Sequence, residues 1–286
     1  MENLFATLEN VKVDYSNLID QQIYNELSFA EKKMNSDLSY LKSVSETFES
    51  TVVNMYFVEE KKLREMYRDN YYSSVETCVS DSIDTFKQKI NLTVISIKDR
   101  FIEKVYSTIN CFYKTDLKNS EVLNRYRKET KEVPTLEKIL SGILKEMPDL
   151  SKAGENLVKE KLLNACKRWQ ETKHNIKITK EKISFPNIIY YDMSWDKKDF
   201  RLFWNFKETK LYHLKNALDM FLNESTCMFN EIHNSRNREV DFNMIYSTRG
   251  NLLEYKFFKN GKLDVIFKDS KTAYEFVKWV GFKLEE

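Results

Sequence analysis

The stretch YKFFKNGKLDVIF, residues Tyr255–Phe267, decides the fold class of the C-terminal part of this chain. Apolar and polar side chains alternate on both sides of Asn260-Gly261, which gives each arm one apolar face, as in a β-strand. A type I′ turn needs positive φ at both of its central residues, and Asn and Gly adopt positive φ at the least cost. The stretch therefore predicts a β-hairpin with a type I′ turn at Asn260-Gly261.

A helix is predicted directly after this hairpin. Its expected N-cap is Asp269 or Ser270, and its expected end is near Gly281. The residues predicted to form its buried face are Ala273, Phe276, Val277 and Val280. Because a lone hairpin is only marginally stable in water, we expect the hairpin and this helix to belong to one small α+β unit.

Two long amphipathic helices are predicted in the N-terminal half. Apolar residues recur at steps of three and four over residues 36–68 and again over 75–109. The second run would form a helix of about 35 residues, near 50 Å long. Its segment 92–97 is rich in β-branched residues, so a break or a short strand there stays open. Each apolar stripe must be covered, either by the other helix or by another subunit.

The composition also favours a mostly helical α+β protein. Only 5 Gly and 3 Pro occur in 286 residues, whereas proteins built from many short strands use these residues in their frequent turns. The shorter elements expected along the chain are helices at 136–144, 155–169 and 206–222 and extended segments at 182–186 and 188–191. We expect a helical domain at 1–133, a connecting segment at 134–154 and an α+β domain at 155–286.

Charge and motifs exclude several classes of function. Lys+Arg is 46 and Asp+Glu is 44, a formal charge of +2, which is not the strong positive excess of a protein that wraps nucleic acid. Glycine-rich phosphate loops, closely spaced metal ligands and nucleophile motifs do not occur, so we expect no enzyme activity, no metal and no cofactor. The four cysteines, expected to be free thiols, are Cys78, Cys111, Cys166 and Cys227. No secretory signal or membrane span is visible, so the expected location is the cytoplasm.

Basic residues gather around the predicted hairpin, interleaved with tyrosines. They are Arg236, Arg238, Arg249, Lys256, Lys259 and Lys262. Such a mixture can contact phosphates and stack bases, but lysines at a strand edge also discourage sheet-to-sheet pairing, and both interpretations stay open. Trp195 and Trp204 stand in an aromatic segment that serves either in the core or as anchors of a protein interface. These eight residues are the candidate partner-binding residues.

The hairpin resembles the C-terminal module of an uncharacterised family of phage and mobile-element proteins with the pattern F-K-N-G-N-x-H-x-x-F. The residues that fit this pattern are Phe258, Lys259, Asn260, Gly261 and Phe267. Lys262 and Asp264 stand where the family has Asn and His, so no role of that His carries over. The resemblance covers only the C-terminal part of the chain.

The long helices, this module, the chain length and a composition rich in Lys, Asn, Ile and Tyr are also similar to the phage-encoded inhibitors of the Gabija antiviral system. That resemblance implies an anti-defence protein in the host cytoplasm. It would act as a homo-oligomer that assembles around the Gabija nuclease complex and blocks DNA binding or cleavage. The alternative is a nucleic-acid-associated accessory protein of a phage or mobile element that uses the basic hairpin.

Overall fold

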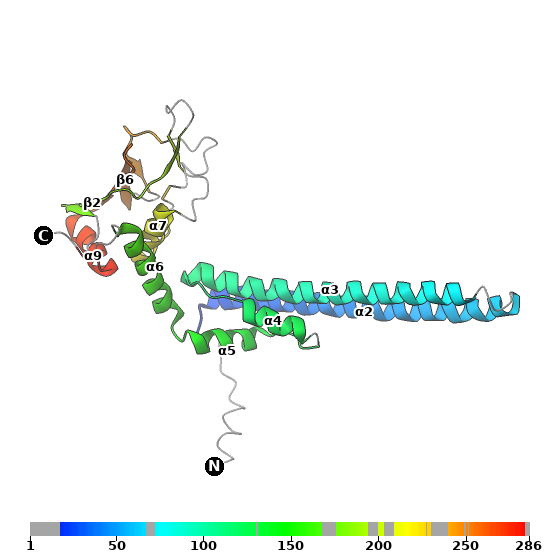
Figure 1. Ribbon diagram of the computed structural model, residues 1–286. Coiled ribbons are helices and arrows are strands. Elements are labelled where there is room, and N and C mark those ends of the chain that lie inside the picture. Colours follow the sequence, from blue (N-terminus) through cyan, green and yellow to red (C-terminus); the bar gives the residue numbers. More distant parts are fainter. Residues whose placement is uncertain are drawn as a thin grey trace, which may run out of the picture. The chain divides into compact units, whose positions relative to one another are not determined.

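The computed structural model divides the chain into two compact units, residues 1–150 and 151–286. The first unit is helical and the second combines helices with a five-stranded sheet, so the predicted mostly helical α+β fold is confirmed (Figure 1). The residues that the structure describes are 18–66, 72–129, 131–167, 176–193, 200–202, 209–226, 228–229, 240–248, 250 and 252–283. Within them, the side chains of residues 53–66, 72–80, 192–193 and 202 lie outside the description.

Two long antiparallel helices, α2 (Gln21–Met66) and α3 (Tyr72–Tyr113), form most of the first unit (Figure 1). Their apolar stripes face each other, and the rings of Phe48 and Phe86 stack with centroids 3.7 Å apart. The two stripes therefore cover each other in part within one chain. Among the described residues, no helix is both long and apolar enough to cross a membrane.

Both long helices extend further than the sequence pattern predicted. α2 begins at Gln21 instead of residue 36, because the buried side chains of Ile23, Leu27 and Met34 continue its apolar stripe toward the N-terminus. α3 runs without a break through residues 92–97. A β-branched side chain loses only part of its rotamer freedom when it enters a helix. The packing of α3 against α2 outweighs that cost.

Two short helices, α4 (Ser120–Lys128) and α5 (Leu136–Glu146), complete the core of the first unit. The Thr135 hydroxyl caps α5 by accepting a hydrogen bond from the backbone N–H of Lys138. The Glu31 carboxylate of α2 accepts another from the N–H of Leu136 at 2.7 Å. These two acceptors satisfy N–H groups that a helix start otherwise leaves without a partner.

α5 falls within residues 134–154, which the sequence assigned to a connecting segment. Its apolar face is buried in the core of the first unit instead, because the spacing of three and four that predicts a helix here also points one face toward α2 and α3. The division between the two units falls later in the same segment, at residues 150 and 151.

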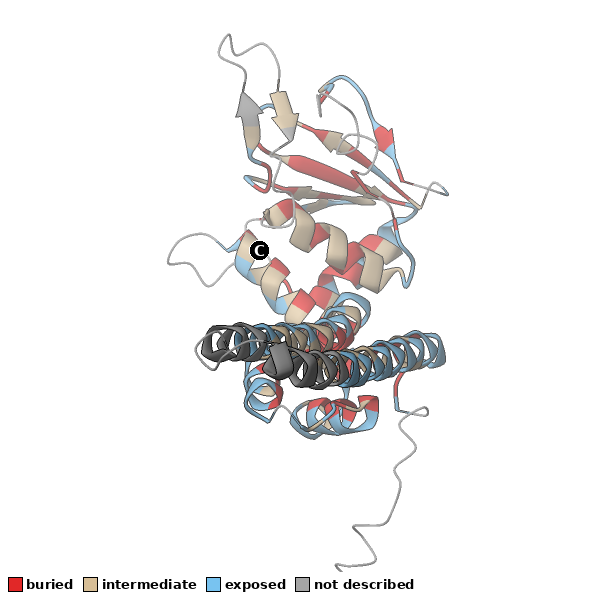
Figure 2. Cartoon of the chain, turned by 90° about the vertical axis from the view of Figure 1, so that its right-hand side faces the viewer, coloured by how far each residue is buried: buried red, intermediate tan, exposed pale blue. Residues whose placement is uncertain are grey.

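The sheet of the second unit has the strand order β1-β2-β7-β6-β5, with every neighbouring pair antiparallel. Its strands are β1 (Lys177–Thr179), β2 (Lys182–Phe185), β5 (Tyr246–Ser247), β6 (Leu253–Phe257) and β7 (Leu263–Phe267). A separate pair joins β3 (Tyr191–Met193) to β4 (Phe200–Leu202). The helices of this unit are α6 (Leu150–Cys166), whose first residue still belongs to the first unit, α7 (Lys210–Phe221) and α9 (Ser270–Val280). They lie on one face of the five-stranded sheet, and the core fills the space between (Figure 2).

The predicted hairpin is confirmed as β6 and β7, but its turn differs from the prediction. Only Gly261 has positive φ, at +75°, and its N–H donates to the carbonyl of Phe258 at 3.0 Å. Phe258 in turn donates to the carbonyl of Lys262. This is a three-residue loop that ends in a left-handed glycine, not a type I′ turn. The reason lies outside the hairpin, where the N–H groups of Ile188 and Ile189 both donate to the Gly261 carbonyl at 3.1 Å.

Those two residues also refine a second expectation, a short strand or extended segment at 188–191. The extended segment predicted at 188–191 is not one strand, because Ile188 and Ile189 hydrogen-bond to the hairpin turn and the strand begins only at Tyr191. Both isoleucines are buried, so their apolar character reflects packing against the turn rather than a place in a sheet. The segment predicted at 182–186 is confirmed as β2.

The predicted helix after the hairpin is confirmed as α9. Asp269 is its N-cap, and its carboxylate accepts a hydrogen bond from the N–H of Thr272 at 2.7 Å. This bond holds the pKa of Asp269 below its usual value. The helix ends at Gly281, which has the left-handed φ of +85°, and its four predicted core residues are buried.

Candidate functional site

The structure places only three of the eight predicted site residues. Trp195, Trp204, Arg236, Arg238 and Arg249 lie outside the described residues. Lys256, Lys259 and Lys262 lie in and beside the hairpin turn. The basic cluster around the hairpin is therefore described only through these three lysines.

The three lysines do not converge. The ammonium group of Lys259 lies 5.8 Å from the ring centroids of both Phe200 and Phe242. Lys256 and Lys262 instead lie near the ring of Phe258, with their ammonium groups 5.8 Å and 3.6 Å from its centroid. The strand alternation that buries Tyr255 and Phe257 turns the even-numbered residues of β6 to the opposite face of the sheet, away from the helices. Among the described residues no helix covers this face, and we call it the open face.

Asp264 lies at the centre of that open face and is almost fully buried, with 4% of its surface exposed. The Ser184 hydroxyl donates to its carboxylate at 2.6 Å. Two ammonium groups, of Lys182 and Lys262, lie 3.4 Å and 3.2 Å from its oxygens. Sequence alternation predicted Asp264 only as an outward polar residue. Its burial arises because β2, which carries Lys182 and Ser184, pairs with β7.

This arrangement can bind anions only weakly at its centre, because the Asp264 carboxylate already neutralises part of the nearby positive charge. The lysines retain partial exposure, with 40% of the Lys182 side chain and 29% of the Lys262 side chain accessible. Together with Lys256 they place three lysines on the open face, two of them near the ring of Phe258, against the carboxylates of Asp264 and the exposed Glu254, so this face is only slightly basic. Such a surface suits contact with phosphate groups more than it suits catalysis.

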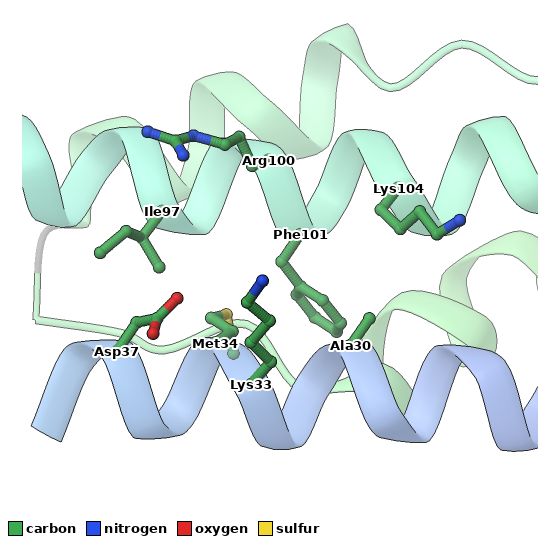
Figure 3. Close-up of a pocket in the computed structure, with 8 residues that line it drawn as sticks. All are labelled: Ala30, Lys33, Met34, Asp37, Ile97, Arg100, Phe101 and Lys104. Carbon is green, nitrogen blue, oxygen red and sulfur yellow. The ribbon is translucent and has the colours of Figure 1, made fainter.

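A second candidate site lies in the first unit, between α2 and α3. It is a cavity of about 210 Å³ lined by Ala30, Lys33, Met34, Asp37, Ile97, Arg100, Phe101 and Lys104 (Figure 3). Its floor is apolar, since Met34 and Phe101 are buried. Its walls are charged, and in the close-up α2 supplies Lys33 and Asp37 while α3 supplies Arg100 and Lys104. We refer to this cavity as the helical groove.

The sequence pattern missed the helical groove, although it identified the apolar stripes that form its floor. Periodicity reveals which residues share a face, but it does not reveal which side of a helix pair the next helices cover. Here Glu31 binds α5, and Lys33, two residues on, is turned about 200° away around α2. The groove therefore opens on the side of the helix pair that α5 leaves uncovered.

No family model, no curated protein and no solved structure matches this chain.

The histidine and cysteine side chains that the structure describes do not gather into a site. No group of three or more His, Cys, Asp or Glu residues in the described part of the chain could hold a metal ion. Cys166 is buried, and burial raises the pKa of its thiol to about 12. His213 on α7 has its pKa lowered by burial and by the nearby charge of Lys161. Cys111 is an exposed thiol; Cys227 and the side chain of Cys78 lie outside the described residues.

Proposed function

We propose that this chain is a phage-encoded anti-defence protein that binds a host antiviral nuclease complex of the Gabija type and blocks it by surface contact. In this proposal the chain makes and breaks no bonds itself. The observation that carries it is the α2–α3 helix pair, which keeps an apolar groove with charged walls on one side. The family resemblance of the sequence supplies the identity of the partner.

Exposed aromatic residues on α2 support a contact function. Phe29 and Tyr40 are each 69% exposed. They are eleven residues apart, which is about three helical turns, so they lie on nearly the same face of α2. Aromatic side chains, Phe and Tyr among them, are enriched in protein interfaces, and Tyr is also enriched among the residues that dominate binding energy. Phe29 also stands one turn before Lys33, at the edge of the helical groove.

The test is a reconstitution with purified components. We expect the chain to co-elute with a Gabija nuclease complex in size-exclusion chromatography with light scattering, and to abolish DNA cleavage at stoichiometric amounts. A double variant, Phe29→Glu with Tyr40→Glu, is expected to lose at least tenfold in affinity, since each change removes an apolar contact and adds a charge.

The matched control is Tyr274→Glu, because Tyr274 on α9 is 61% exposed and belongs to the second unit. This variant is expected to bind like the unaltered chain. Full DNA cleavage in the presence of excess chain, with no co-elution, would contradict the proposed function. The same light-scattering measurement gives the oligomeric state, which we propose to be a homo-oligomer.

A second candidate function is binding of single-stranded nucleic acid. The observation that favours it is the open face of the sheet, where Lys256 and Lys262 flank the ring of Phe258. We expect affinity for a labelled oligonucleotide to fall linearly with salt on a log–log scale, and Lys256→Gln to reduce that slope by about one. Lys32→Gln, on exposed α2, is the control. The absence of any mobility shift at low salt would reject this function.

A further inference from the structure

The helical groove is not the only hollow along the described part of the α2–α3 pair. A second cavity of about 390 Å³ opens further along the same two helices, at Phe48 and Phe86. Between the two cavities, apolar residues of both helices remain only half-buried. They are Leu41 and Val44 of α2 and Ile90 and Val94 of α3. We refer to the strip of helix surface that runs from the first cavity over these half-buried residues to the second cavity as the depression.

The length of this depression fits a helix. From Ala30 to Phe48 the α2 backbone advances 18 residues, which is about 27 Å at 1.5 Å per residue. A partner helix of about five turns would span that distance. Packing a third helix between two antiparallel helices is the usual way to bury the apolar residues that the pair leaves half-exposed.

The charges at the end of the depression near Lys33 and Arg100 indicate which kind of partner helix it would bind. The Lys104 ammonium group pairs with the Glu26 carboxylate, and the Arg100 guanidinium donates to the neutral Ser96 hydroxyl at 3.1 Å. Among the ion pairs of the described residues, none involves Lys33 or Arg100, which stand on opposite walls. Asp37 alone adds a negative charge to these walls. This end is therefore net positive.

We propose that the depression between α2 and α3, from Ala30 and Phe101 to Phe48 and Phe86, binds one amphipathic helix of a protein partner. The apolar stripe of that helix lies on the groove floor. Acidic residues flank the stripe where it passes between Lys33 and Arg100. This inference rests on the proposed function, of which it names the contact.

The experiment uses the full chain and two labelled 18-residue helical peptides. Both peptides carry leucines at i, i+3, i+4 and i+7 spacing over their length, with flanking glutamates in one and flanking lysines in the other. Fluorescence anisotropy is expected to show at least tenfold tighter binding of the acidic peptide at low salt. Added salt is expected to reduce that preference, because the wall charges are exposed.

Charge reversal locates the site. The double variant Lys33→Glu with Arg100→Glu is expected to lose the tenfold preference for the acidic peptide. The control is Lys118→Glu with Lys128→Glu, which makes the same change in net charge at exposed positions outside the groove and is expected to keep the preference. Circular dichroism melting curves establish that both double variants fold. Equal binding of the two peptides, or a preference that survives the Lys33 and Arg100 changes, would overturn the inference.

Other occupants give different outcomes. If the chain self-associates and the Lys33→Glu, Arg100→Glu variant is monomeric, the occupant is a second copy and the inference is wrong. If that variant still inhibits the nuclease complex fully, the inference fails while the proposed function stands. If the acidic peptide binds in the groove but the chain does not bind the nuclease complex, the proposed function fails and the docking of an acidic helix stands.

Discussion

Replacing Gly261 with alanine is expected to lower the free energy of unfolding of the second unit by about 3 kcal/mol. Gly261 has φ of +75°, a conformation that costs an alanine about 1–2 kcal/mol. A Cβ atom added there would lie 2.7 Å from the carbonyl oxygen of Ile189. That oxygen belongs to the backbone and cannot rotate away, and Ile189 is itself held to Gly261 by a hydrogen bond. The collision and the strain therefore add.

The control for this change is Gly281→Ala at the end of α9. Gly281 also has positive φ, at +85°, but an added Cβ would meet no atom within 4 Å. Its expected cost is the conformational strain alone, about 1–2 kcal/mol. Urea unfolding followed by circular dichroism measures both variants. Equal costs for the two glycines would contradict the expected collision between an added Cβ at residue 261 and the carbonyl oxygen of Ile189.

Replacing Lys98 with alanine is expected to destabilise the first unit by about 2–3 kcal/mol. Lys98 on α3 is only 2% exposed. Its ammonium group donates to the backbone carbonyl of Glu132 at 2.6 Å, which ties the segment before α5 to α3. Burial lowers the pKa of Lys98, partly offset by the negative charge of Glu132. Alanine would remove both the packed aliphatic stem and the donor.

Two further variants separate these contributions. Lys98→Met keeps a long apolar side chain but no donor, so it is expected to cost about 1.5 kcal/mol, the low end for a hydrogen bond that involves a charged group. Lys87→Ala is the control, because the Lys87 side chain is 49% exposed and its ion pair with Glu49 is expected to contribute less than about 1 kcal/mol. If Lys98→Ala were no more costly than Lys87→Ala, the buried tie to Glu132 would carry no stability. Thermal unfolding of the three variants decides this.

The parts of the fold that local pattern determines were predictable from the sequence. The strands of the hairpin alternate along a short stretch, and the cap at Asp269 and the end at Gly281 lie within one helix. For residues 92–97 the sequence left two alternatives open, a continuous helix and a break or short strand, and α3 is continuous there. Local propensity at residues 92–97 disfavours a helix, and only packing against another element overrides it.

Features that depend on contacts between distant segments could not be predicted in the same way. The turn at Gly261 departs from type I′ because residues some seventy positions earlier bond to its carbonyl. Asp264 is buried because Ser184, 80 residues away, lies beside it. Lys33 of α2 and Arg100 of α3 line the same cavity only when the two helices pair. Each needs a register or a helix pairing that no single segment encodes.

The sequence grouped Lys256, Lys259 and Lys262 at the hairpin and all three lie there, but only Lys256 and Lys262 approach the same ring, that of Phe258. Strand alternation explains the first pair, since both lie on the open face of the sheet. Lys259 lies in the turn itself, and its direction depends on Phe200 and Phe242, which other segments supply. A turn residue has no fixed face, so its neighbours follow only from the tertiary structure.

The position of β7 in the middle of the sheet has a consequence for how the chain folds. β7 bonds to β6 across a short turn, yet it also pairs with β2, whose residues come about 80 positions earlier. Closing so long a loop carries an entropy cost that slows folding. α2 and α3, by contrast, follow each other closely in the sequence, so their pairing closes a much shorter loop. During synthesis the helical unit can therefore be complete before the sheet closes, and the proposed docking groove would form before the second unit does.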